Sequence, residues 1–378
     1  MSFTQEVLSP VLQSRRLLCQ PIKDFHQQTL ITINKKPLEK WSISLGDGLL
    51  FDYSGLQAIK QIIQTYHGSA KQLYFKLQLS EQAIRDYYSH SHYLGRDGLI
   101  TLPIVASITI DPSEKELEIV AVDAFSDTLL ITLEELSTPT HSPLSLAPPD
   151  INSTPLALLM PYSADHDFLF ANQIAIFANL KQHLKSSPFS WIKALFLHRK
   201  ISLKKRISLA WKQIHPSADI HPTAVIEGSI IGAGCRIGAY SVVRYSILGE
   251  NIQLYDGAKV EFSVVDKNSS LMHDLVLYRC LVEEEVFLIH GPYQFSFFQR
   301  ESAAFATIMM DYRPDNKPIR ISTAKGVRDY QGRFLGALLE EQAKVFAGTL
   351  TAPGITIPKG RQITCSIENI TTAKTLLK

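Results

Sequence analysis

The sequence predicts two structural parts: a mixed α/β domain at the N-terminus and a parallel β-helix, a hexapeptide-repeat solenoid, at the C-terminus. Two observations predict the β-helix. Aliphatic residues recur every 17 residues in steps of six, six and five, and small residues follow many of them four positions later. The aliphatic positions form three columns, which are Ile214, Ile231, Leu248, Val265 and Val282; Ile220, Ile237, Leu254, Leu271 and Leu288; and Ile226, Val243, Val260 and Leu277.

This spacing is typical of a three-sided coil. Each side is a short strand, a large apolar residue points to the axis, and a small residue lets the chain turn. One coil cannot bury its own apolar side chains, so at least three coils must stack for stability. We expect the β-helix over 214–368, with an insertion near 291–330 where the aromatic-rich stretch from Tyr293 loses the six-residue phase, and a tail over 369–378.

Residues 1–136 mix strand and helix patterns, which predicts an α/β layer domain. The expected strands are 30–33, 48–53, 72–79, 99–110, 117–124 and 128–133, and the expected helices are 56–66 and 81–88. A stretch rich in proline, serine and threonine predicts an exposed linker over 137–166.

A basic helical connector is expected over 167–213. No acidic residue lies between Asp167 and Asp219, and over 189–212 lysine and arginine alternate with apolar side chains. One interpretation is a basic amphipathic helix that touches an anionic membrane or a phosphorylated ligand. The other is a connecting helix whose apolar side packs on the solenoid while its lysines are solvated. The sequence leaves both open.

The composition describes an ordinary globular chain of 378 residues, with 45% hydrophobic residues, 20% charged residues and a net charge of +2. This length allows two domains with separate cores. The near-neutral charge gives no reason to expect a nucleic-acid partner. Four widely spaced cysteines indicate reduced thiols. Because no signal-type stretch and no apolar run of about 18 residues is present, we expect a cytoplasmic protein.

Candidate chemistry lies at turns where side chains depart from the repeat. The position two places after the second aliphatic column is occupied by Ala239, Asp256, His273 and His290, one coil apart. Imidazole titrates near neutral pH, so two stacked histidines with a carboxylate could form a general-base site. A single surface histidine is usually inert, and the hypothesis therefore rests on the column. No metal site is expected.

Three stretches carry a resemblance to a known family. They are Gly238-Ala239-Tyr240 followed by Arg244, the coil with Ser269, His273 and Leu277, and the run DYRPDNK from Asp311 to Lys317. In these stretches the chain resembles the acetyltransferase half of the bifunctional N-acetylglucosamine-1-phosphate uridylyltransferase/glucosamine-1-phosphate acetyltransferase family. The stretch 167–172 is similar to the helix that joins the two domains in related sugar nucleotidyltransferases. The resemblance covers residues 160–366.

The resemblance implies a left-handed β-helix that assembles as a homotrimer. It implies that His273 takes a proton from an amine as the amine attacks an acyl thioester, and that Arg244 and Lys317 hold a sugar phosphate. The donor implied is acetyl-CoA or another acyl-CoA lying along the coils, with no prosthetic group. The residues implied to line the acceptor pocket are Asp311, Tyr312, Asn316 and His290.

The chain also departs from this family. A family lysine is replaced by Glu261, a tyrosine by Val276, an asparagine by Phe287, and a glycine-rich run by 283–285. A nucleotidyltransferase needs a glycine-rich phosphate loop near its start, whereas the first 45 residues contain no glycine. We therefore expect a divergent transferase of sugar-nucleotide and cell-envelope metabolism, most simply an acyl-CoA-dependent N-acyltransferase acting on a sugar phosphate or nucleotide sugar. The alternative is a catalytically inactive sugar-nucleotide-binding or scaffold protein at a membrane surface.

Overall fold

The computed structural model describes residues 2–5, 16–24, 26–27, 41–46, 48–67, 72–108, 126–133, 155, 157–186, 212–323 and 325–365. Several expectations fall outside these residues, namely the strands at 30–33 and 117–124, most of the linker, the basic stretch 189–211 and the tail after 368. The chain divides into two compact units. The first is 1–178 with 323–325, and the second is 179–322 with 326–378.

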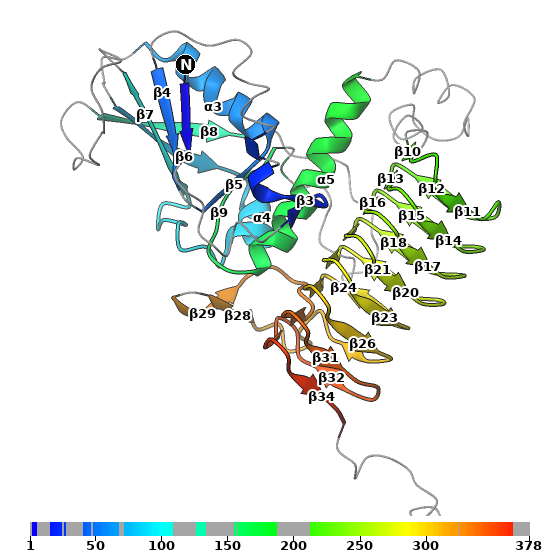
Figure 1. The fold of residues 1–378 in the computed structure, drawn as a ribbon. Coiled ribbons are helices and arrows are strands. Elements are labelled where there is room, and N and C mark those ends of the chain that lie inside the picture. The colour runs from blue at the N-terminus through cyan, green and yellow to red at the C-terminus, as the bar shows by residue number, and fades with distance from the viewer. Residues whose placement is uncertain are drawn as a thin grey trace, which may run out of the picture. The chain divides into compact units, whose positions relative to one another are not determined.

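The first unit contains a five-stranded mixed sheet in the order β1-β4-β7-β6-β8 (Figure 1). Its strands are β1 (Ser2–Gln5), β4 (Trp41–Leu45), β7 (Ile100–Ile108), β6 (Gln72–Gln78) and β8 (Ser126–Thr132). β7 is antiparallel to β4 and β6, whereas β1–β4 and β6–β8 are parallel pairs. Leu73, Phe75 and Leu77 of β6 are fully buried and alternate with partly exposed residues, as expected for a strand with one face in the core. The expected α/β domain is confirmed.

Helix α3 (Tyr53–Thr65) buries Leu56, Ile59 and Ile63, which the helical period places on one side. Asp52 caps it: its carboxylate accepts hydrogen bonds from the backbone N of Gly55 at 2.7 Å and of Leu158 at 3.0 Å. Burial raises the pKa of Asp52 to about 6 despite these bonds. The other short elements are β2 (Arg16–Leu17), β3 (Gln20–Pro21), β5 (Leu49–Phe51), β9 (Leu159–Pro161), α4 (Glu81–Ala83) and η1 (Ile84–Tyr88).

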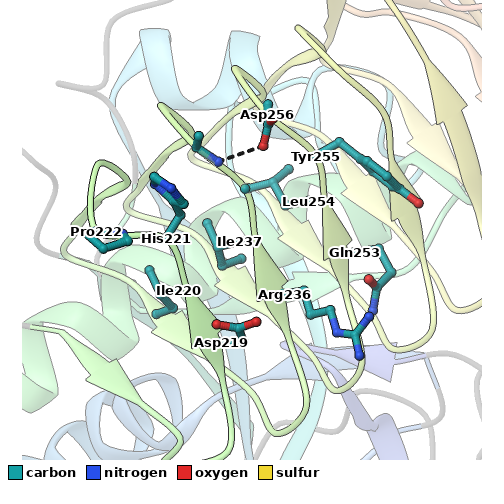
Figure 2. A pocket seen from close by; sticks show the side chains of 12 residues that line it. Asp219, Ile220, His221, Pro222, Arg236, Ile237, Gln253, Leu254, Tyr255 and Asp256 are labelled. Carbon is teal, nitrogen blue, oxygen red and sulfur yellow. Dashed lines mark hydrogen bonds between the residues drawn. The ribbon is translucent and has the colours of Figure 1, made fainter.

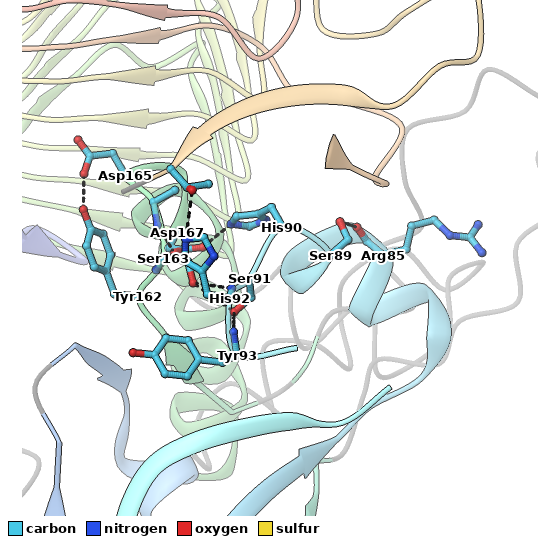
Figure 3. Close-up of polar contacts among 12 residues, drawn as sticks. Arg85, Ser89, His90, Ser91, His92, Tyr93, Tyr162, Ser163, Asp165 and Asp167 are labelled. Carbon is cyan, nitrogen blue, oxygen red and sulfur yellow. Dashed lines mark hydrogen bonds and ion pairs between the residues drawn. The ribbon is translucent and has the colours of Figure 1, made fainter. Parts of the chain in front are cut away.

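Helix α5 (His166–Ser186) is buried on all sides over residues 167–178, as its apolar sequence requires. At its start the Asp167 carboxylate contacts the His90 ring at 2.7 Å and accepts hydrogen bonds from two backbone N–H groups, those of Ser163 and Ala164 (Figure 3). His166 beside it is also buried, and among the residues that the structure describes neither of its ring nitrogens has a hydrogen-bond partner. Burial therefore lowers the pKa of His166 to about 4.

The second unit is a parallel β-helix whose coils have three faces (Figure 1). The first face is β10 (Gln213–Ile214), β13 (Ile230–Ile231), β16 (Ile247–Leu248), β19 (Val264–Val265), β22 (Leu281–Val282), β25 (Phe297–Phe298), β30 (Leu338–Leu339) and β33 (Thr356–Ile357). The second face is β11 (Asp219–Ile220), β14 (Arg236–Ile237), β17 (Gln253–Leu254), β20 (Ser270–Leu271), β23 (Phe287–Ile289), β26 (Ala303–Phe305), β31 (Lys344–Val345) and β34 (Gln362–Ile363). The third face is β12 (Val225–Glu227), β15 (Val242–Arg244), β18 (Lys259–Glu261), β21 (Val276–Tyr278) and β24 (Tyr293–Gln294), continued by β27 (Ile308–Met309) and β32 (Leu350–Thr351).

The aliphatic columns form the core of this unit, as predicted. Residues 17 apart are paired in register, for example Ile231 with Leu248 and Leu254 with Leu271. All columns are buried from the second coil onward, whereas Ile214 in the first coil is only partly buried because no described coil stacks below it. The fold class expected for the C-terminal part is therefore confirmed as a parallel β-helix.

One corner of the coil carries a second set of small residues, three positions after the third aliphatic column. Between the third and first faces, a ladder of buried side chains begins with Ser229, Ser246 and Ser263. Each hydroxyl accepts a hydrogen bond from the backbone N of the matching residue one coil on, at 3.0–3.1 Å, and the last of these donors is Cys280. These bonds satisfy amides that the turn removes from the sheets.

The first face is apolar on both sides over its middle strands, from β16 to β30. Each of these strands is an aliphatic or aromatic doublet, so one residue points to the axis and its neighbour points outward. The outward residues are also buried, with exposed fractions of 8% at Ile247, 1% at Val264, 4% at Leu281 and 0% at Phe297. The end strands β10 and β33 differ, because their outward residues are the polar Gln213 and Thr356.

The insertion begins later than expected. Tyr293 pairs with Leu277, Phe298 with Val282 and Ala304 with Leu288, so a complete coil follows Pro292. This coil is one residue shorter than each of the coils before it, which breaks the 17-residue count without breaking the stack. The true departure is 310–337, which contains the hairpin of β28 (Ile319–Thr323) and β29 (Gly326–Tyr330). Coiling then resumes at β30.

Within the residues that the structure describes, no helix has both the length and the apolar character needed to cross a membrane.

We expect the first unit to lose stability as the pH falls from about 6.5 to about 4, the ordinary and folded pKa values of His166. A neutral buried histidine gains a proton more readily after unfolding, so the unfolded state binds more protons in this window. His166 would contribute up to about 3 kcal/mol. His26, whose pKa burial lowers to about 3, acts in the same direction, whereas Asp52 with its raised pKa opposes both.

Urea unfolding at several pH values would measure this, using Trp41 fluorescence in a Trp191→Phe, Trp211→Phe background so that only the first unit reports. His166→Phe removes one titrating group and should flatten the pH dependence. An equally steep fall in this variant would show that His166 does not contribute.

Candidate functional site

One edge of the β-helix, where each coil turns from the second face to the third, carries the candidate site. The turn residues Ala239, Asp256, His273 and His290 lie one coil apart along this edge, as predicted. Both histidines are exposed. A solvent-accessible imidazole can accept and return a proton near neutral pH.

A groove of about 450 Å³ lies on the same edge over the first three coils (Figure 2). Asp219, Arg236 and Gln253 are in-register neighbours on β11, β14 and β17 and form its floor on the second face. Figure 2 shows the side chain of Arg236 lying beside that of Gln253. Tyr255 and Asp256 close the groove at the turn. The floor of the groove thus offers one cation, one amide and one carboxylate to a polar ligand, and Asp256 at the turn adds a second carboxylate.

Tyr255 links the groove to the histidine column. Its ring lies edge-on to the ring of His273, with 5.1 Å between the centroids. Asp256 does not orient His273, since its Oδ1 accepts a hydrogen bond from the backbone N of Ala239 at 2.8 Å. In the described part of the chain, no carboxylate is hydrogen-bonded to the ring of His273. A base at this point would act from a solvent-facing position at the end of the groove.

Arg244, expected to hold a phosphate, is held between two glutamates instead. Its Nε is 2.7 Å from Glu227 Oε2 and its Nη1 is 3.0 Å from Glu261 Oε1. These three residues are 17 apart and stack on the third face. The two carboxylates raise the pKa of Arg244, and its charge is already balanced within the chain. Glu261, a departure from the resembling family, is therefore a structural partner of Arg244.

The other expected site residues lie together in the loop that follows β27. Arg313 binds Asp315 through two hydrogen bonds of 2.9 and 2.6 Å, which hold the pKa of Asp315 well below its usual range. Lys317 donates its backbone N–H to the same carboxylate at 3.3 Å. Tyr312 is exposed and its ring centroid lies 6.3 Å from that of Phe334.

Asp311 and Asn316 complete this loop. The backbone carbonyl of Asp311 accepts a hydrogen bond from the backbone N of Leu335 at 2.7 Å, and burial raises the pKa of its carboxyl group. Asn316 adopts a positive φ of 55°, a conformation that asparagine tolerates well in turns. These contacts fix the ends of the loop and leave the side chains of Tyr312 and Lys317 exposed.

One chain does not bring the expected residues together. Arg244 on β15 and the loop after β27 are four coil steps apart, roughly 19 Å at the usual strand spacing. His273 and His290 form one group on the edge, and residues 311–317 form another. The groove residues Asp219, Arg236 and Gln253 were not predicted from the sequence. Their spacing of 17 was a usable signal, because it places three unlike polar side chains next to each other.

In the part of the chain that the structure covers, no group of three or more His, Cys, Asp or Glu residues could hold a metal ion.

No family model matches the chain, and no curated protein matches it. Solved structures give weak matches. A hexapeptide transferase family protein from Anaplasma phagocytophilum is 17% identical over 44% of this chain and 82% of its own, with a TM-score of 0.25. A mutant GDP-perosamine N-acetyltransferase from Caulobacter crescentus, in complex with CoA and GDP-perosamine, is 15% identical over 40% of this chain and 51% of its own, with a TM-score of 0.19.

The acetyltransferase domain of PglB from Neisseria gonorrhoeae, in complex with acetyl coenzyme A, is 19% identical over 40% of this chain and 53% of its own, with a TM-score of 0.15. The chain thus spans about half the length of these last two proteins. Similarities of this size do not assign an activity to the chain. The functional proposal must rest on its own residues.

Proposed function

We propose that the β-helix is an acyl-CoA-dependent N-acyltransferase acting on a sugar phosphate or a nucleotide sugar. The observation that carries this proposal is an exposed imidazole, His273, at the end of a polar groove and in contact with Tyr255. In the reaction the acceptor amine forms a bond to the thioester carbonyl carbon as the C–S bond breaks. His273 takes the proton from the nitrogen and returns it to the CoA thiolate.

The groove supports recognition of an anionic acceptor. Arg236 is exposed, and no ion pair joins it to another residue that the structure describes. Its guanidinium can bind a phosphate through two parallel hydrogen bonds, and Gln253 beside it can bind a sugar hydroxyl. We therefore assign the phosphate contact to Arg236 rather than to Arg244, whose charge two glutamates already balance.

The loop residues can join this site only across subunits. Tyr312 and Lys317 are exposed but lie coils away from His273 on their own chain. In a homotrimer, which the family resemblance implies, the loop of one copy would meet the histidine edge of another. This part of the proposal places Asp311, Tyr312, Asn316 and Lys317 at a shared acceptor site.

The second candidate function is a sugar-nucleotide-binding or scaffold protein without catalysis. Two observations favour it: His273 lacks a hydrogen-bonded carboxylate among the described residues, and the Arg244 charge is balanced. Such a protein would bind the same acceptor in the groove but would not turn over a thioester.

The variant His273→Ala distinguishes the two candidate functions. We expect this variant to bind acetyl-CoA, glucosamine-1-phosphate and UDP-N-acetylglucosamine as the unchanged chain does, with a stabilisation of about 2.7 kcal/mol at a hundred times the dissociation constant. Turnover should fall by about 10²–10⁴-fold, since a general base contributes this much. Thermal shift and a free-thiol assay would measure binding and turnover.

His215→Ala is the matched control, because His215 is an exposed histidine of the first coil that contacts Ser217 and does not line the groove. Binding without turnover in the unchanged chain would support the second candidate. Absence of binding by all three ligands would refute both.

We expect Arg236→Ala to weaken binding of glucosamine-1-phosphate by about 10-fold or more, the usual effect of losing a charged hydrogen bond. Arg244→Ala should change the dissociation constant by less than about twofold, because two glutamates already balance the charge of this partly buried arginine. Isothermal titration calorimetry would compare the two. The reverse ranking would return the phosphate to Arg244 and contradict our assignment.

A further inference from the structure

The edge that carries the histidines changes from polar to apolar along its length. The position just after each second-face aliphatic is Tyr255, Met272, Ile289, Phe305 and Phe346 in successive coils. The groove lies at the polar end of this edge, and His273 and His290 lie in the middle. In the described coils beyond them this position is apolar, except in the last coil. The site therefore has a direction.

The apolar end is a strip of six residues: Phe287, Ile289, Phe305, Ile308, Phe346 and Leu350. Its aromatic rings are in contact. The centroids of Phe287 and Phe305 are 5.7 Å apart, and Phe305 and Phe346 stack at 5.1 Å with an interplanar angle of 5°. Stacking across two coils gives the strip a continuous aromatic wall along one side.

Two aliphatic residues form the other side of the strip. Ile308 and Leu350 are paired in register on β27 and β32 and are 67% and 63% exposed. Between the two sides lie Ala306 and Ala347, both exposed, which continue the His273–His290 column by two further coils. Small residues at the centre and large apolar ones on both sides leave room for a narrow apolar ligand. A contiguous exposed apolar patch is typical of an interaction site.

The strip begins next to the proposed base. The backbone N of Ala306 donates to the carbonyl of Ile289, and the backbone N of Gly348 donates to the carbonyl of Ala306, so these coils stack directly. From His273 to Ala347 there are three coil steps, roughly 14 Å. An extended medium-chain fatty acyl group has a comparable length. A thioester held beside His273 could thus send its chain along the strip while the polar acceptor occupies the groove.

We propose that this strip binds the hydrocarbon chain of the acyl donor, so that the donor carries a medium or long acyl chain rather than acetyl. The inference rests on the proposed function for the location of the thioester. An acetyl group has a single methyl and would leave the strip in water. Each methylene moved from water to an apolar surface improves affinity by up to about fourfold, so chain length provides a direct measure.

The test uses acetyl-, butyryl-, octanoyl- and dodecanoyl-CoA as donors with glucosamine-1-phosphate as acceptor. We expect kcat/KM for dodecanoyl-CoA to exceed that for acetyl-CoA by at least about tenfold. In Leu350→Ser and in Phe346→Ala this ratio should fall by about tenfold. Val225→Ser is the matched control, since Val225 is the equivalent outward residue on the first third-face strand, is 37% exposed and lies away from the strip. It should keep the ratio of the unchanged chain.

Binding of the same donors to His273→Ala separates this inference from the proposed function. Acetyl transfer by the unchanged chain, with a kcat/KM that does not rise with acyl-chain length, would overturn the strip assignment and still support the acyltransferase. Binding that strengthens with chain length and is lost when Leu350→Ser is added, with no transfer by the unchanged chain, would support the strip and refute the acyltransferase. No binding of any donor would overturn both.

Other occupants of the strip give distinct results. If a second copy of this chain covers the strip, Leu350→Ser should change the sedimentation coefficient, and kcat/KM for dodecanoyl-CoA should not exceed that for acetyl-CoA. If the segment 366–378 covers the strip, kcat/KM should rise with acyl-chain length only after that segment is deleted. Either result would overturn the assignment to an acyl chain.

Discussion

The in-register stacking of parallel coils is the constraint on which the second unit depends. Each coil contributes one aliphatic side chain per face to columns that run along the axis, and its backbone pairs with the coils on either side. Because neither the apolar columns nor the strand edges can be satisfied by a single coil, the coils stabilise each other. The buried serine ladder extends the same rule to a corner, where a hydroxyl replaces the missing backbone partner.

The same stacking decides which side chains can act together. Residues one period apart become neighbours, so Glu227, Arg244 and Glu261 form an ion-pair ladder, and Asp219, Arg236 and Gln253 form the floor of a groove. Residues close in sequence but on different faces point in different directions. A chemical site on this scaffold is therefore arranged along an edge, where side chains from successive coils follow one another in order.

Much of this was readable from the sequence, because the aliphatic period reports burial directly. The columns, β6, α3 and α5 were predicted on this basis. Strands β1 and β4 were missed, since the serines in β4 obscure the alternation and its pairing with β1 depends on residues far apart in sequence. The coil from Tyr293 was misread, because two buried aromatics and a missing residue hid its register. The histidine column was predicted, but the neutralisation of Arg244 required the pairing of actual side chains.

The outward side of the first face has a consequence for how the hydropathy of the chain is interpreted. Val264, Leu281 and Phe297 are buried but do not belong to the axial core. Their strands place two consecutive apolar residues where the alternation between inward and outward positions requires only one. The apolar content of the coils is therefore larger than the axial core alone needs, and burial of a residue in this β-helix does not by itself tell which way its side chain points.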